Sequence, residues 1–158
     1  MISRLLVSRN RADPLFAVRT YALVSIAQHD ALIASGAGDA ATGPAAVASA
    51  SAVLLAHLFP NEVPYLANAL RSHLDQLEEA APAAAVSRGA VLGHAIADSV
   101  LARRHGDGWN DLSTRVAPAA GGWTSNPRSG MLYPLRPNWG AVRPMFLETN
   151  HQFRPAEP

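Results

Sequence analysis

Apolar residues recur at helical spacing along the first part of the chain, and the first such stretch begins at Asp13-Pro14. Aspartate is a favoured N-cap residue, and proline suits the first turn of a helix. Small residues at 35–38 then interrupt the pattern. The pattern therefore predicts a helix over residues 13–35. Its apolar stripe consists of Leu15, Val18, Ala22, Ile26 and Ile33.

Three further helices are bounded by proline or glycine, and we predict them at 44–59, 61–80 and 82–105. The last carries Gly89 and Gly93, four residues apart among alanines, which would let a neighbouring backbone approach closely. Short connections between these helices make them antiparallel neighbours in a bundle. The sequence therefore predicts an all-α fold, a helical bundle of about four helices.

The composition changes beyond residue 105, where helical periodicity ends. Residues 106–158 hold all three tryptophans and most of the prolines. Aromatic residues set among prolines favour an extended tail that its rings pin to a surface. A partly disordered linker is the alternative, above all for the last dozen residues. We therefore divide the chain into a helical bundle at 1–105 and an irregular wrapping tail or linker at 106–158.

Charged residues are scarce for a globular protein. They make up 16% of the chain, and the formal net charge is +1; typical domains contain about 25%. All thirteen basic residues are arginines, and they are scattered along the chain. This distribution excludes the clustered basic face that nucleic-acid binding requires. The low charge indicates that further chain or a partner subunit covers part of the surface.

The absence of cysteine excludes disulfides and thiolate metal sites, and it leaves the compartment open. The apolar stretch at the N-terminus is too short for a signal peptide. No run reaches the roughly 18 apolar residues of a membrane-spanning helix, so we expect no transmembrane segment. A cytoplasmic location and export with a lost signal both stay open.

Several segments carry, in order along the chain, a resemblance to a known family: 12–31, 53–60, 92–108, Pro137-Asn-Trp-Gly140 and Gln152-Phe-Arg-Pro155. Together they resemble bacterial proteins related to the vanadium-dependent haloperoxidases, in the superfamily of type 2 phosphatidic acid phosphatases. The resemblance covers nearly the whole chain. It implies two helical bundles, of which this chain forms the first bundle and the connecting segment. The vanadate or phosphate site would then lie largely on a second helical half or a partner chain.

The family builds its oxyanion site from three motifs, because several cations must balance the charge on the equatorial oxygens. The first motif is a Lys, six further residues and Arg-Pro, and it cannot exist in a chain without lysine. The second, Pro-Ser-Gly-His, is also absent, since its nearest equivalent at 42–45 lacks both Ser and His. Two of the three motifs are therefore absent.

The third motif is Ser-Arg, five residues, His, and Asp four further on, and it is present at 87–98. The resemblance implies that His94 is the nucleophile or vanadate ligand and that Asp98 orients its imidazole. Ser87 and Arg88 would bind the phosphate or vanadate. His94 and Asp98 share a helix face at this spacing, but a continuous helix turns Arg88 about 240° from His94. A chance match within a first-bundle helix therefore competes with a diverged site.

Other polar residues have simpler interpretations. We expect His29 and Asp30 to make a local cap or an inter-bundle hydrogen bond. The remaining histidines lack the spacing of a zinc site, so no metal site is predicted. The tail arginines would meet carboxylates on a second bundle or an anionic substrate: Arg128, Arg136, Arg143 and Arg154.

Two functions remain open. The first is a non-catalytic scaffold, the N-terminal helical half of a haloperoxidase-like or acid-phosphatase-like protein that acts only with a second half or partner chain. The alternative is a diverged phosphatase or haloperoxidase that uses the 87–98 motif and is completed by homo-oligomerisation. Whether the chain is an enzyme stays undecided, and vanadate is a cofactor by resemblance only.

Overall fold

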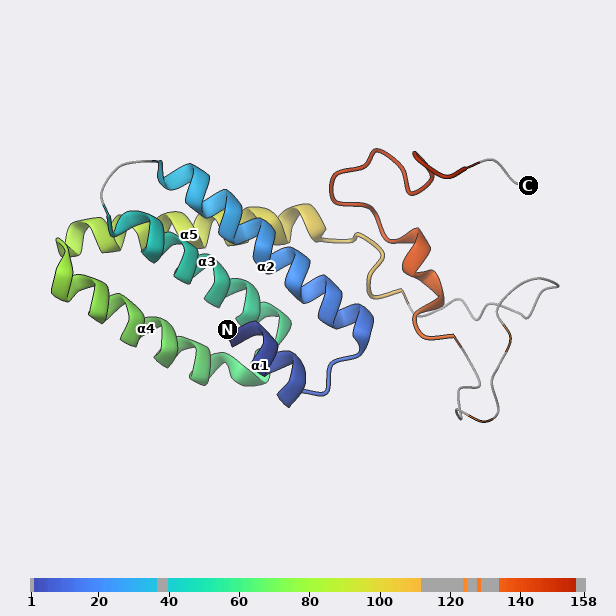
Figure 1. Cartoon of the computed structure of the whole chain (residues 1–158), viewed down its shortest axis with the longest axis horizontal. Coiled ribbons are helices and arrows are strands. Elements are labelled where there is room, and N and C mark those ends of the chain that lie inside the picture. Colours follow the sequence, from blue (N-terminus) through green and yellow to red (C-terminus); the bar gives the residue numbers. More distant parts are fainter. Residues whose placement is uncertain (1, 37–39, 112–123, 125–127, 129–133, 156–158) are drawn as a thin grey trace. The chain divides into compact units, whose positions relative to one another are not determined.

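The computed structural model describes residues 2–36, 40–111, 124, 128 and 134–155. The regular elements of these residues are all helices, which confirms the predicted all-α fold (Figure 1). The chain divides into two compact units, Met1–Arg104 and His105–Pro158. In the part of the chain that the structure describes, no helix combines the length and the apolarity needed to cross a membrane.

The described residues of the first unit form five α-helices and one short 3-10 turn. In order these are α1 (Ile2–Arg9), α2 (Pro14–Ser35), α3 (Thr42–Leu58), η1 (Pro60–Glu62), α4 (Val63–Ala80) and α5 (Ala83–Arg104). The four predicted helices correspond to α2 through α5. The helix predicted at 61–80 begins within the turn η1 and becomes α-helical at Val63.

The sequence pattern predicts no helix before residue 13, so α1 was not predicted. Its eight residues are too few for a stable isolated helix, so tertiary contacts must hold it. Leu6 is fully buried, and Asn10 Nδ2 donates a hydrogen bond to Glu62 Oε1 at 3.1 Å. Arg9 Nη1 lies 3.4 Å from Glu62 Oε2. One buried leucine and two polar contacts to the residue before α4 thus fix the N-terminal helix.

α2 begins and ends as predicted. Asp13 Oδ1 accepts a hydrogen bond from Phe16 N–H at 2.9 Å, and Pro14 occupies the first turn. The helix stops at Gly36, whose φ of 65° lies in the region that glycine adopts most easily.

The apolar stripe noted on α2 is not the side that the bundle buries: Leu15, Ala22 and Ile26 are half-buried. Val18 and Ile33 are 56% and 67% exposed. The buried residues of α2 are Arg19, Thr20, Leu23, Val24, Ala27 and Ala31. Apolar residues surround the whole circumference of this helix, so spacing alone could not select the face that packs on the core.

The core of the bundle is the contact between α3 and α5. α3 runs through the middle of the bundle and contacts α2, α4 and α5 (Figure 1). A Cβ built at Gly89 would lie 2.7 Å from Ala45 Cβ, and one built at Gly93 would lie 2.8 Å from Ser49 Cβ. Real Cβ atoms do not approach so closely, so only glycine allows this separation. The close approach predicted from the glycine pair is confirmed.

α4 covers α3 and α5 less completely than α2 does. Its Leu74 and Leu77 pack against a buried cluster that includes Ala45 and Val86. Leu66 is the buried residue of α4. The rest of its apolar side is only partly covered, which leaves space between α4 and the neighbouring helices.

The described residues of the second unit are held by tryptophans and arginines. The rings of Trp109 and Trp139 meet edge to face with centroids 5.1 Å apart, and Trp139 belongs to the 3-10 turn η3 (Pro137–Ala141). The Arg136 guanidinium lies 4.2 Å from the centroid of the Trp109 ring, and Arg143 N–H donates to Asp107 O at 2.8 Å. Trp109 and Trp139 therefore pack on each other within this unit, whereas Phe146 and Phe153 are exposed. Trp123 lies outside the described residues.

Candidate functional site

The four residues of the predicted oxyanion motif all lie on α5, which continues without a break from Ala83 to Arg104. Ser87, Arg88, His94 and Asp98 are all exposed. At about 100° per residue, the separation of six positions from Arg88 to His94 places the two side chains about 120° apart by the shorter way around the helix. The motif is thus a helical surface, without the turn that would let Arg88 and His94 converge.

His94 and Asp98 share a face of α5, as their spacing predicts, but they do not form the orienting hydrogen bond. Neither makes a hydrogen bond or ion pair with another described residue. Val91, which is 68% exposed, occupies the arc of α5 between His94 and Arg88. An exposed valine thus stands where an oxyanion site needs a donor or a cation.

These residues of one chain do not fit vanadate or phosphate as a set. Arg88 is the one permanently charged cation among the four, and it faces away from His94. Stabilising an oxyanion requires several donors aimed at one point. A second chain or segment would have to supply the others.

The residues inside the motif have a clear structural role. Gly89 and Gly93 lie on the opposite side of α5, where they meet Ala45 and Ser49 of α3. Val86 and Ala97 continue this buried side. Helix packing therefore explains the intervening residues of the motif.

The pair His29 and Asp30 makes polar contacts that stabilise the bundle. Asp30 Oδ2 accepts a hydrogen bond from Arg103 Nη2 of α5 at 3.1 Å, and His29 Nδ1 lies 3.4 Å from Asp30 Oδ1. The contact is therefore partly local and partly between two helices of the same bundle. All three residues are at or near the surface, so the bonds are weak.

The tail arginines that the structure describes have different surroundings. Arg136 lies over the Trp109 ring, and Arg143 Nη2 donates to His105 O at 3.4 Å. Arg128 and Arg154 are exposed. The described contacts of Arg136 and Arg143 are thus internal to the second unit.

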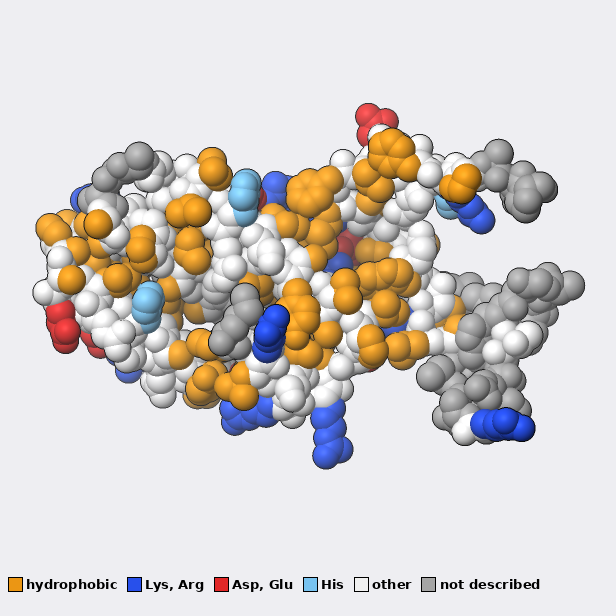
Figure 2. All heavy atoms as spheres, in the orientation of Figure 1, with side chains coloured by type: hydrophobic (Ala, Val, Ile, Leu, Met, Phe, Trp, Pro, Cys, Tyr) orange, Lys and Arg blue, Asp and Glu red, His pale blue; other side chains and the backbone are white. Residues whose placement is uncertain are grey.

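An exposed apolar face runs along α2 and was not recognised from the sequence. Val18, Tyr21, Leu32 and Ile33 are exposed by 56%, 37%, 57% and 67%. Apolar side chains also spread over much of the bundle surface in view in Figure 2, with few charged groups among them. The signal for this face was the apolar character of α2 on all sides.

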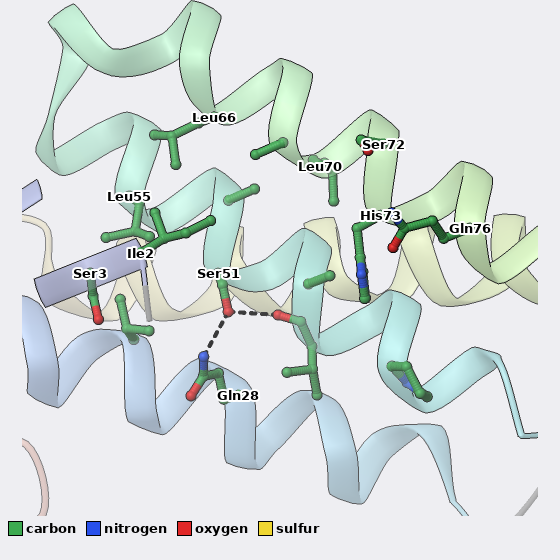
Figure 3. A pocket seen from close by; sticks show the side chains of 16 residues that line it. Ile2, Ser3, Gln28, Ser51, Leu55, Leu66, Leu70, Ser72, His73 and Gln76 are labelled. Atoms are coloured by element: carbon green, nitrogen blue, oxygen red, sulfur yellow. Dashed lines mark hydrogen bonds between the residues drawn. The ribbon is translucent and has the colours of Figure 1, made fainter. Parts of the chain in front are cut away.

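A cavity of about 620 Å³ lies among α1, α2, α3 and α4 (Figure 3). Leu55 and Leu66 line one end, and His73 and Gln76 line the other. Between the ends, Gln28 Nε2 donates a hydrogen bond to Ser51 Oγ at 2.9 Å. No spacing pattern in the sequence predicts this cavity, because it arises from the distance between α3 and α4.

Among the described residues, no group of three or more His, Asp or Glu side chains could hold a metal ion. The resemblance to the haloperoxidase family rests on the sequence segments quoted above and stays a prediction. No protein-family model, no curated protein and no solved structure matches the chain.

Proposed function

We propose that the helical unit is a non-catalytic scaffold, the first bundle of a haloperoxidase-like or acid-phosphatase-like protein. It acts by presenting α2 to a second helical half or a partner chain. The observation that carries this proposal is the exposed apolar face of α2, formed by Val18, Tyr21, Leu32 and Ile33.

The geometry of this face suits a helix packed on both sides. At about 100° per residue, its four apolar side chains fall within roughly 120° of the circumference of α2. Stripes of this width are typical of a helix side that faces a core. From Val18 to Ile33 the face extends over roughly 22 Å of helix axis. The opposite side of α2 already contacts α3 and α5, so a partner on this face would enclose the helix.

The composition agrees with a covered surface. Only 16% of the residues are charged, and an extended exposed apolar face is typical of an interaction site. The polar residues in the stripe are Ser25 and His29, and it contains no Arg, Asp or Glu.

The motif geometry on α5 supports a scaffold over the alternative. A diverged phosphatase or haloperoxidase would use Ser87, Arg88, His94 and Asp98, completed by self-association. These residues diverge around α5, so each chain would contribute an incomplete set. Vanadate belongs to this alternative through the resemblance only.

Activity and vanadate binding separate the two functions. The complete chain is assayed for hydrolysis of p-nitrophenyl phosphate, and for bromide oxidation with vanadate and hydrogen peroxide. We expect no turnover, and no vanadate binding by vanadium NMR. Turnover or vanadate binding that disappears in His94→Ala would overturn the scaffold proposal and support the enzyme.

Sedimentation velocity tests the α2 face itself. We expect the chain to self-associate as its concentration rises, because the exposed apolar side chains of α2 can pack against those of a second copy. The double variant Leu32→Gln with Ile33→Gln should be monomeric over the same range. Val63→Gln with Tyr65→Gln, at the exposed start of α4, is the matched control and should associate like the unmodified chain. An unmodified chain that stays monomeric throughout, or a control that dissociates equally, would contradict the proposal.

A further inference from the structure

The cavity among α1, α2, α3 and α4 is a channel along α3 that is partly open to solvent. Its lining on α3 runs from Pro44 to Leu55, which is roughly 16 Å of helix axis. Leu55 and Leu66 at one end are each 3% exposed. His73 at the other end is exposed to solvent. Figure 3 shows the leucines and His73 at opposite ends of the lining. The channel therefore has an apolar interior and a polar mouth.

The hydrogen bonds at its centre fix the orientation of the Gln28 carboxamide. Ser51 Oγ donates to Val47 O at 2.7 Å, so its single proton is already used. Ser51 can then only accept from Gln28, which must present its NH₂ group at 2.9 Å. The carboxamide oxygen and the second N–H of Gln28 have no partner among the described residues. Gln28 thus offers a ligand in the channel one acceptor and one donor.

The lining carries no permanent charge. Among its sixteen described residues there is no Arg, Asp or Glu, and His73 is the one ionisable side chain. Moving an ion out of water without an opposite charge is costly, so this channel disfavours charged ligands. Its volume of about 620 Å³ falls within the range of small-molecule sites.

We propose that this channel binds a neutral, unbranched aliphatic molecule with one hydrogen-bonding group, of which a medium-chain primary alcohol is the simplest example. The aliphatic part contacts the leucines and alanines of α3 and α4. The hydroxyl group bonds to the free oxygen or N–H of the Gln28 carboxamide. This binding site is separate from the α2 face, and it does not depend on the scaffold function.

The proposal is tested by NMR titration of the complete, isotope-labelled chain with octan-1-ol. We expect saturable shifts confined to amides along the channel, around Ser51 and Leu70. Octanoate at neutral pH has the same chain length and a negative charge, and it should bind more than about tenfold more weakly. Shifts that never saturate, shifts centred on the α2 face, or octanoate binding equal to that of the alcohol would each overturn the proposal.

Matched substitutions locate the site. Ala69→Phe fills the channel, whereas Ala67→Phe places the same ring on the exposed side of α4, outside the lining. We expect Ala69→Phe to weaken octan-1-ol binding more than about tenfold, since the ring occupies the ligand's volume. Ala67→Phe should leave binding unchanged. If Ala69→Phe does not fold, Ala48→Leu fills the same channel from α3 and takes its place. Equal binding by the filled variant and its control would refute the site.

Gln28→Leu tests the hydrogen bond, because leucine has a similar size and no polar atoms. We expect octan-1-ol to bind several-fold more weakly to a variant that melts normally. Unchanged affinity in a folded Gln28→Leu chain would refute the role given to Gln28.

Discussion

Gly93→Ala perturbs the tightest contact of the bundle. A Cβ at this position would overlap the carbonyl oxygen of Ala46, and it would lie 2.8 Å from Ser49 Cβ and 2.9 Å from Ala50 N. Two of these three atoms belong to the α3 backbone, so rotating a side chain cannot relieve the contact. α3 and α5 would have to move apart, and the packing on both sides of Gly93 would loosen.

The expected loss of stability follows from two opposing effects. Inserting a group into a packed core costs about 1–3 kcal/mol, and a backbone neighbour favours the upper value. Alanine is better than glycine inside a helix by about 1 kcal/mol. The free energy of unfolding should therefore fall by about 2 kcal/mol in Gly93→Ala. Urea denaturation followed by circular dichroism measures this difference, provided that the denaturant slope is unchanged.

Gly43→Ala is the matched control. A Cβ at Gly43, in the first turn of α3, would meet only the flexible Ser35 Oγ at 3.3 Å and Leu32 Cδ1 at 3.8 Å. Its stability should equal that of the unmodified chain or exceed it by up to about 1 kcal/mol. If Gly93→Ala proves as stable as Gly43→Ala, the proposed cause of the close α3–α5 contact is wrong. Adding Ser49→Gly to Gly93→Ala should recover little stability, since the backbone contacts remain.

Three other substitutions test the polar groups of the bundle. Thr20→Val should raise the free energy of unfolding by about 1 kcal/mol, because the fully buried Thr20 hydroxyl has no hydrogen-bond partner among the described residues; a loss in urea denaturation would contradict this. Glu62→Ala should cost about 1 kcal/mol, because it removes one of the two acceptors of Asn10 Nδ2 and the ion-pair partner of Arg9, and α1 amides should then exchange hydrogen faster. Asp30→Asn should cost less than about 1 kcal/mol, because its pair with Arg103 is partly exposed, and the difference should shrink at high salt.

The long helices were predictable because capping residues mark where they begin and end. The Asp13 side chain accepts a hydrogen bond from an N–H group in the first turn of α2, and Pro14 has no N–H group that would need a partner. Gly36 ends the helix with a positive φ. The glycine pair on α5 was equally informative, because glycine among alanines has few uses other than a close backbone contact. These effects act within a few residues, so a single sequence contains them.

The parts that were not predictable depend on tertiary packing. α2 is apolar on all sides, so spacing could not tell that Val18 and Ile33 face outward while Leu23 faces the core. α1 is too short for a reliable pattern and depends on Glu62, which lies more than fifty residues away in sequence. The cavity has no signature in any one helix, because its volume is set by the distance between α3 and α4.

The oxyanion motif on α5 shows that a sequence match must be checked against the directions in which the matched side chains point on the helix. The match specifies four positions, and the residues between them are free to serve another purpose. Here Gly89 and Gly93 serve the contact with α3, so the inner side of α5 is explained by packing. The outer side presents His94, Val91 and Arg88 in succession around the helix. An oxyanion site would need these positions to converge, whereas a continuous helix spreads them over about 120°. Val91, at the centre of this arc, is exposed and offers no hydrogen-bond donor or charge to an anion.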